Sequence, residues 1–111
     1  MSATQAVAIR YKDVEHDSEL EEVIETRCGA LAQEFPEANH FEVQLAMQAG
    51  EVEVHAHVSG RSTRFASHAR DNRPRAAVDG ALEKLHRELR RHHDKLIFGM
   101  RREAQRTRAN R

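Results

Sequence analysis

The chain has 111 residues, of which 39% are hydrophobic and 32% are charged, and its formal net charge at pH 7 is zero. This length supports one hydrophobic core and is too short for two ordinary domains. No apolar run approaches the roughly 20 residues that cross a bilayer, so no membrane partner is predicted, and the N-terminus lacks the pattern of a secretory signal. Cys28 is the only cysteine, which excludes an internal disulfide and fits a reducing compartment. We therefore expect a cytoplasmic protein.

Strands are predicted first, from the alternation of apolar and polar residues. Two half-buried strands are expected at residues 5–11 and 39–48. The turn Gln48-Ala49-Gly50 joins the second of them to a third strand at residues 51–60, as in an antiparallel hairpin. A weaker pattern at residues 62–69 predicts a fourth strand, at an edge of the sheet or under the start of the next helix.

A first helix is predicted between the first two strands, because apolar residues recur there at helical spacing. These residues are Leu20, Val23, Ile24, Cys28, Leu31 and Phe35. We expect Asp17 or Ser18 to cap the N-terminus. Ser18 and Glu21 have the spacing of a capping box, and Pro36 helps to end the helix.

A second helix is predicted to begin near Pro74, since proline is well tolerated in a first turn. Its apolar side comprises Val78, Ala81, Leu82, Leu85, Leu89 and Leu96. Gly80 lies in its interior, where glycine costs up to about 1 kcal/mol relative to alanine. Close packing, or the close approach of a partner, would explain this glycine.

The predicted fold class is α+β, with the order β-α-β-β-β-α and a four-stranded sheet. Polar residues on one side of each strand indicate that both helices pack on one face and that the other face lies in water. We expect this domain to span residues 1–98. Residues 99–111 are basic and lack apolar periodicity, which predicts a frayed helix end and a disordered tail.

The zero net charge conceals two oppositely charged halves. Residues 1–60 hold 3 basic and 12 acidic residues, and residues 61–111 hold 15 basic and 6 acidic residues, which gives net charges of −9 and +9. Such asymmetry indicates that one face attracts a polyanion and the other repels it. Mutual attraction between the two halves is the alternative explanation.

A basic stripe is predicted along the second helix. It consists of Lys84, Arg87, Arg91 and Lys95. On an ideal helix these side chains fall within an arc of roughly 80°. Their like charges repel one another, so the arrangement does not stabilise the helix itself. Cations in such a row can, however, meet successive phosphates. Further basic residues could extend the stripe at the entrance of the helix: Arg61, Arg64, Arg70, Arg73 and Arg75. The alternative is an ordinary solvated helix face.

The sequence gives only weak support for a metal site or a catalytic site. His55 and His57 share a strand face and His68 could join them as a third zinc ligand, but no cysteine pair or known ligand spacing accompanies them. Cys28 lies on the apolar side of the first helix, as a buried structural thiol would. The chain has no nucleophile motif and no phosphate-binding glycine loop. We predict no enzyme, no metal, no cofactor and no small-molecule substrate.

One segment resembles a known family: residues 65–96, FASHARDNRPRAAVDGALEKLHRELRRHHDKL. It is similar to the second half of the ribosome hibernation-promoting factors, also called ribosome-associated inhibitors or sigma-54 modulation proteins. That family has Ala-Ala-Ile-Asp, then Lys-Leu, then a basic stretch ending in Asp-Lys-Leu. The matching residues here are Ala76-Ala77-Val78-Asp79, Lys84-Leu85, Arg87-Glu88-Leu89-Arg90 and Asp94-Lys95-Leu96. Arg73-Pro74-Arg75 departs from the family, which usually has an acidic residue and a tyrosine there.

The resemblance implies a stress-response protein that binds the small ribosomal subunit and its rRNA in the channel for messenger and transfer RNA, where it blocks translation. It places the stripe against rRNA, with Arg90 at its flank and Arg27 where the family often has a lysine. Arg73 and Arg75 complete the expected RNA-binding set. Long members carry a C-terminal dimerisation domain; these 111 residues resemble the short form, and we expect a monomer.

Two alternatives remain open at this stage. The first is a general module that binds structured RNA through the same stripe. The second is a protein-interaction or metal-responsive module that uses the histidines on the open face of the sheet.

Overall fold

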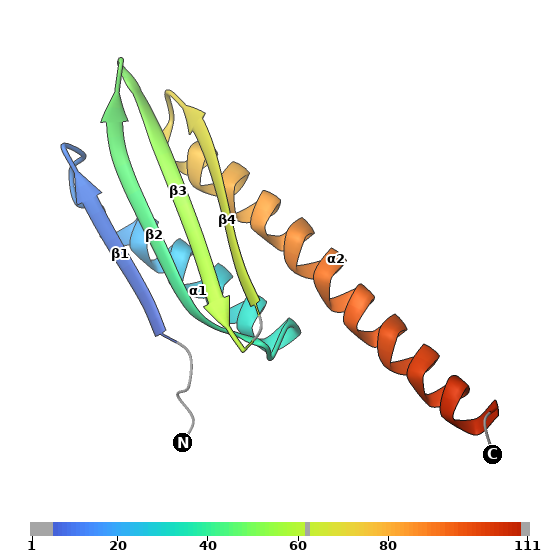
Figure 1. Cartoon of the computed structure of the whole chain (residues 1–111). Coiled ribbons are helices and arrows are strands. Elements are labelled where there is room, and N and C mark those ends of the chain that lie inside the picture. Colours follow the sequence, from blue (N-terminus) through green and yellow to red (C-terminus); the bar gives the residue numbers. More distant parts are fainter. Residues whose placement is uncertain (1–5, 62, 110–111) are drawn as a thin grey trace.

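The computed structural model describes residues 6–61 and 63–109, with side chains as far as residue 100. The elements along the chain are β1 (Ala6–Lys12), α1 (Ser18–Glu34), β2 (Ala38–Gln48), β3 (Glu51–Gly60), β4 (Thr63–Asp71) and α2 (Pro74–Ala109). This order is the predicted β-α-β-β-β-α, and every predicted strand and helix is present (Figure 1).

The strands form a single sheet in the order β1-β2-β3-β4. β1 pairs in parallel with β2, while β3 pairs antiparallel with both β2 and β4. Both helices cover one face, and the opposite face is open (Figure 1). The predicted α+β architecture is therefore confirmed, and so is the edge position of β4.

The core lies between the sheet and the two helices. It consists of alternate strand residues and of one side of each helix, as the periodicity predicted. Its largest fully buried side chains are Phe35, Phe41, Ile24, Leu45, Leu82, Leu85, Leu89, Val43, Val54, Val58, Val78 and Cys28. Gly80 packs against this layer, because a Cβ atom there would lie 3.1 Å from the Cβ atom of Ala69 on β4. Close packing of α2 on β4 thus explains the glycine.

The β2–β3 connection is a tight turn through Ala49 and Gly50. Their φ angles are 52° and 80°, so both residues are in the left-handed region that a type I′ hairpin turn requires. The expected hairpin is confirmed. It also fixes the register in which the open-face residues of the two strands face one another.

The N-terminal cap of α1 is Asp17. Its carboxylate accepts hydrogen bonds from the backbone amides of Glu19 at 3.0 Å and Leu20 at 3.3 Å. The expected capping box of Ser18 and Glu21 was wrong, because Asp17 takes the capping position and moves Ser18 into the first helical turn. The Glu21 carboxylate instead accepts a hydrogen bond from the Tyr11 hydroxyl.

α2 begins at Pro74, as predicted, and extends past the end of the sheet (Figure 1). Leu89 is fully buried, whereas Leu96 is 42% exposed, so the prediction that Leu96 lies in the core was wrong. The helix has left the sheet by that residue, and no strand covers it. None of the described helices combines the length and apolar character that a membrane span requires.

The described part of the segment predicted to be a disordered tail, residues 99–109, is helical. Arginine, glutamate, glutamine and alanine all favour helices, and after Gly99 this part contains no glycine or proline that would stop propagation. Residues 110–111 lie outside the described residues. A helical backbone does not decide where the domain ends, so the boundary at residue 98 stays a prediction.

Candidate nucleic-acid interface

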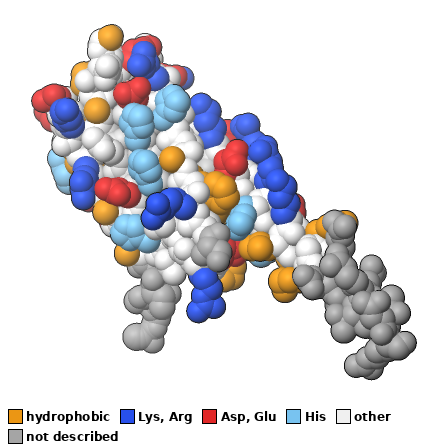
Figure 2. Space-filling model, in the orientation of Figure 1, with side chains coloured by type: hydrophobic (Ala, Val, Ile, Leu, Met, Phe, Trp, Pro, Cys, Tyr) orange, Lys and Arg blue, Asp and Glu red, His pale blue; other side chains and the backbone are white. Residues whose placement is uncertain are grey.

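The basic stripe of Lys84, Arg87, Arg91 and Lys95 lies on the side of α2 next to β4, and all four side chains are exposed. Figure 2 shows the resulting row of Lys and Arg side chains along the helix. Arg87 and Lys95 make no ion pair within residues 6–61 and 63–100. Arg91 Nη1 lies 3.5 Å from Glu88 Oε2, which is a weak surface contact. The charge of the stripe is therefore mostly uncompensated.

A groove runs between the stripe and the edge strand β4. It has a volume of about 300 Å³, and its walls are Phe65, Ala66, Ser67 and His68 on β4 and Lys84, Arg87, Glu88 and Arg91 on α2. Lys84 Nζ reaches β4 and donates a hydrogen bond of 2.9 Å to the carbonyl oxygen of His68. The groove was not predicted, because it forms only when β4 and α2 pack together.

Arg90 faces α1, away from the stripe. Its guanidinium donates a hydrogen bond to the Glu34 carboxylate and lies 6.0 Å from the centre of the Phe35 ring. Both contacts tie α2 to the end of α1. The positive charge of Arg90 is thus paired with a carboxylate and an aromatic face within the protein.

The other three members of the expected RNA-binding set, Arg27, Arg73 and Arg75, also have carboxylate partners. Arg27 Nη1 and Arg75 Nε lie 2.8 Å and 3.3 Å from Asp79 Oδ1, so the Asp79 carboxylate joins α1 to the first two turns of α2. Arg73 pairs with Asp71 at 3.5 Å. The Arg73 backbone amide also donates to the Asp71 carboxylate, which lowers the pKa of that carboxyl below its usual value. These pairs hold the entrance of α2 in place.

Two arginines expected at the helix entrance lie elsewhere. Arg64 and Arg70 point to the open face of the sheet from β4. Arg70 contacts Glu53 at 3.2 Å on β3, and this hydrogen bond lowers the pKa of Glu53. The expectation that Arg64 and Arg70 extend the stripe was wrong, because alternate residues of a strand face opposite sides and these two face away from α2.

A cluster around Phe35 was not predicted. The rings of His86 and His93 on α2 meet Phe35 edge-on, each with a centroid distance of 5.6 Å. His93 Nδ1 lies 3.1 Å from Glu37 Oε2. His86 Nε2 lies 3.1 Å from Glu34 Oε1, an ion-pair distance without hydrogen-bond geometry. The spacing of His86, Arg90 and His93 on one helix face was the signal that could have found it.

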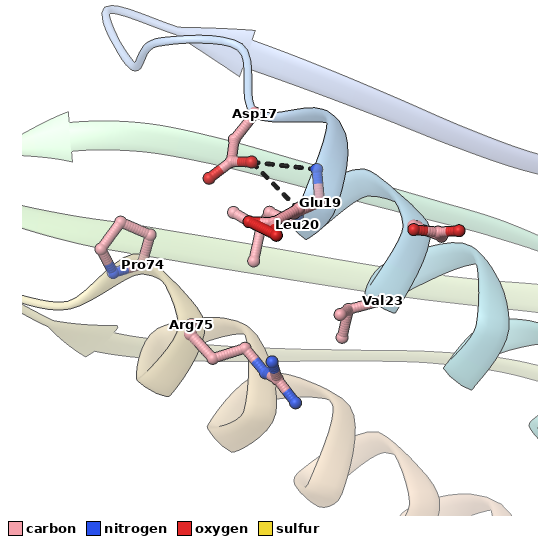
Figure 3. A pocket seen from close by; sticks show the side chains of 7 residues that line it. Asp17, Glu19, Leu20, Val23, Pro74 and Arg75 are labelled. Carbon is pink, nitrogen blue, oxygen red and sulfur yellow. Dashed lines mark hydrogen bonds between the residues drawn. The ribbon is translucent and has the colours of Figure 1, made fainter.

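The depression at the starts of α1 and α2 has the opposite character. It has a volume of about 430 Å³ (Figure 3). Asp17, Glu19 and Glu22 lie at its rim, and its only basic side chain, Arg75, is paired with Asp79. These carboxylates repel phosphate, so this end of the molecule does not continue the basic surface.

Two of the histidines on the open face of the sheet pack against each other. The rings of His55 and His68 stack at a centroid distance of 5.6 Å. Across the described part of the chain, no group of three or more His, Cys, Asp or Glu side chains is arranged to hold a metal ion. Cys28 is fully buried, and burial raises the pKa of its thiol to about 12, which leaves it unreactive.

A family profile described as "Sigma 54 modulation protein / S30EA ribosomal protein" matches residues 7–97, which include the whole stripe. The chain belongs to this family. No curated protein sequence matches the chain. The family assignment therefore rests on the profile, and it agrees with the resemblance of residues 65–96.

Two solved structures share the fold of this family member. A ribosomal subunit interface protein from Coxiella burnetii is 16% identical, with a TM-score of 0.74 over 81% of this chain and 99% of that chain. The N-terminal domain of Protein Y from Thermus thermophilus is 14% identical, with a TM-score of 0.69 over 79% of this chain and 99% of that chain. At these identities the likeness establishes a common fold.

Proposed function

We propose that this protein binds the small ribosomal subunit through its rRNA, near the channel for messenger and transfer RNA, and inhibits translation in stressed cells. It would act in the cytoplasm as a monomer and without catalysis. The observation that carries the proposal is the row of exposed, mostly unpaired cations on α2 in a member of the S30EA family. The structural neighbour described as a ribosomal subunit interface protein supports the choice of partner.

The geometry of the stripe suits phosphate groups. From Lys84 to Lys95 the helix rises about 16 Å, and its cations are spaced three or four residues apart along one side. Cations held in such a row displace the ions condensed on RNA and give an affinity that depends on salt but little on sequence. Phe98 is 61% exposed and lies beside Arg91 and Lys95, past the C-terminal end of the stripe. Between Lys84 and Lys95 the sequence has no Phe, Tyr or Trp, so phosphate and shape recognition, rather than base stacking, is the proposed mode.

The paired arginines have a supporting part in this proposal. Arg27, Arg73, Arg75 and Arg90 were all expected to contact RNA, but each lies beside a carboxylate of the protein. We infer that they hold α2 and its entrance in position. Any contact that they make with rRNA must compete with these carboxylates, so the four stripe residues should supply most of the affinity.

The test is sedimentation of the protein with ribosomes and with separated subunits across a salt series. With four to six phosphate contacts, affinity should fall about a hundredfold to a thousandfold for a fourfold rise in salt. Replacing all four stripe residues by glutamine should abolish binding, and this variant must first be shown to be folded. Lack of binding by the unmodified protein at low salt would refute the proposal.

A matched pair of variants tests whether position matters as well as charge. Arg87→Gln and Lys12→Gln each remove one exposed cation that has no ion pair among the described residues, the first on the stripe and the second on β1. Only Arg87→Gln should weaken binding to the small subunit and reduce translation inhibition. Equal effects would indicate that net charge, rather than the stripe, drives association.

A general structured-RNA module remains the competing function, because phosphate contacts alone carry no sequence information. Competition with an unrelated structured RNA distinguishes the two. If that RNA displaces the protein from ribosomes at equal phosphate concentration, the general module is correct; if a large excess fails to do so, the ribosome is the specific target.

A further inference from the structure

The open face of the sheet carries a compact group of basic and polar side chains. The register of the strands places His40 on β2 opposite Ser59 on β3, and Ser59 opposite Arg64 on β4. In the next row, Glu42 lies opposite His57, which lies opposite Ala66. Neighbouring strands lie about 4.8 Å apart, so these rows form one small patch.

A shallow depression of about 340 Å³ lies in this patch, and His40, His57, Ser59 and Arg64 are among the residues that line it. Ser59 is small, and so is the neighbouring Ala66, which leaves space between the longer side chains. Figure 2 shows several histidines on this face, beside the Lys and Arg row of α2. We call the depression the open-face basin, defined by His40, His57 and Arg64.

The charges around the basin favour an anion. Arg64 is exposed and has no carboxylate partner in the described structure, and His40 and His57 are also without one. The single carboxylate that lines the basin belongs to Glu42, and Arg10 Nη2 on β1 lies 3.5 Å from its Oε2. The one negative charge is therefore already paired.

The neighbouring ionisable groups belong to a separate cluster. His55 stacks on His68 and lies 3.5 Å from Glu53, and Glu53 also contacts Arg70. Glu51 lies 3.9 Å from Arg70. This second cluster contains its own carboxylates, so it offers less net attraction to an anion than the open-face basin does.

We propose that the open-face basin binds a phosphate group of RNA, and that it does so more strongly as the pH falls below neutrality. A guanidinium group can donate two parallel hydrogen bonds to a phosphate, and a protonated imidazole donates from both ring nitrogens. Imidazole is the ordinary side chain that gains charge between about pH 8 and pH 5. This proposal depends on the proposed function in one respect only, which is that the phosphate group belongs to RNA.

The position of the basin makes a shared RNA ligand feasible. β4 separates it from the groove beside the stripe, and Lys84 already reaches the carbonyl oxygen of His68 at this edge. An RNA strand that follows the groove and crosses β4 would meet Arg64 and His57 on the other side. The basin would thus add a pH-dependent contact to a stripe whose charge is constant, because Lys and Arg stay protonated.

A direct test uses NMR of the imidazole and guanidinium signals, with hexauridylate as the probe. At about pH 6 the signals of His40, His57 and Arg64 should shift on titration, and at about pH 7.5 the response should be weaker. No shift at the lower pH would overturn the proposal. A response to inorganic phosphate as strong as that to hexauridylate would overturn the assignment to RNA.

A second test measures binding to ribosomes at constant ionic strength. Between about pH 7.5 and 6 the affinity should rise about threefold to tenfold, and the double variant His40→Gln/His57→Gln should lose this rise. The control His55→Gln/His68→Gln removes the same number of imidazoles from the same face and should keep the rise. Equal pH responses in the two double variants would contradict the proposal.

Failure of the two proposals can be told apart. If ribosomes are not bound at any pH, the proposed function fails, and the NMR titration still decides whether the basin binds phosphate. If ribosomes are bound through the stripe with no dependence on pH, only the open-face basin is refuted.

Discussion

Two sides of α2 carry arginines that differ in their surroundings. Arg87 lies on the stripe, exposed and with no ion pair in the described structure, whereas Arg90 lies against α1, beside Glu34 and Phe35. The two residues are one helical turn apart and have the same chemistry. The difference comes from their neighbours, which belong to other elements. Arg87 is available to a ligand, whereas Arg90 stabilises the fold.

The largest expected effect concerns the stability contributed by the Phe35 cluster on the α1 side of α2. Phe35→Ala removes a side chain that is 1% exposed and that contacts His86, Arg90 and His93. We expect the free energy of unfolding to fall by about 3–5 kcal/mol, because the variant leaves a cavity between α1 and α2. Chemical denaturation measures this loss. Met47→Ala, at a residue that is 47% exposed, is the control and should change stability little.

The stripe side is tested by Arg87→Gln. Loss of one phosphate contact should weaken ribosome binding about threefold to tenfold and reduce the slope of log affinity against log salt by about 0.9. The free energy of unfolding should stay within about 0.5 kcal/mol of the parent value, because Arg87 is exposed and lies away from features that stabilise the fold. An unchanged salt slope would show that Arg87 does not meet a phosphate.

The α1 side is tested by Arg90→Gln, with the opposite expectation. The free energy of unfolding should fall by about 0.5–1.5 kcal/mol, from the lost Glu34 pair and the contact with the Phe35 ring. The salt slope of ribosome binding should not change. Arg91→Gln is the matched control for stability, because Arg91 has only a 3.5 Å contact with Glu88 on its own helix. A reduced slope for Arg90→Gln would return Arg90 to the RNA-binding set.

The smallest expected effect concerns acid stability at the entrance of α2. The Arg73 backbone amide donates to Asp71 and lowers the pKa of that carboxyl in the folded state. Asp71 therefore stabilises the fold above the usual carboxyl pKa, and this contribution is lost as the pH falls through the usual value towards the lower folded value. In Asp71→Asn, stability measured by denaturation should depend less on pH in this acidic range. Glu83→Gln, at an exposed residue without an ion pair in the described structure, is the control for the removal of one carboxylate.

Much of the fold could be predicted because it follows from local patterns. Alternation in residues 39–48 and 51–60 and the turn at Gly50 require only a periodicity of two and a residue that tolerates positive φ. Pro74 indicated the first residue of α2 because proline is well tolerated in the first turn of a helix. The capping box at Ser18 failed because two adjacent capping residues compete, and the sequence does not rank Asp17 above Ser18.

The candidate site was only partly predictable. The stripe lies on one helix, so its spacing alone determines that Lys84, Arg87, Arg91 and Lys95 share a side. The partners of the other arginines are distant in the sequence: Arg90 and Glu34 are separated by 56 residues, and Arg27 and Asp79 by 52. No local pattern reports such pairs, so charge alone could not separate binding residues from structural ones.

The sequence by itself determined the order of the elements, the buried side of each one and the row of cations on α2, because each follows from the geometry of a single helix or strand. Only the tertiary structure decided which cations remain unpaired, that a groove separates α2 from β4, and that His40, His57 and Arg64 meet on the open face. These features arise between elements, where packing and strand register bring together residues that no local periodicity relates.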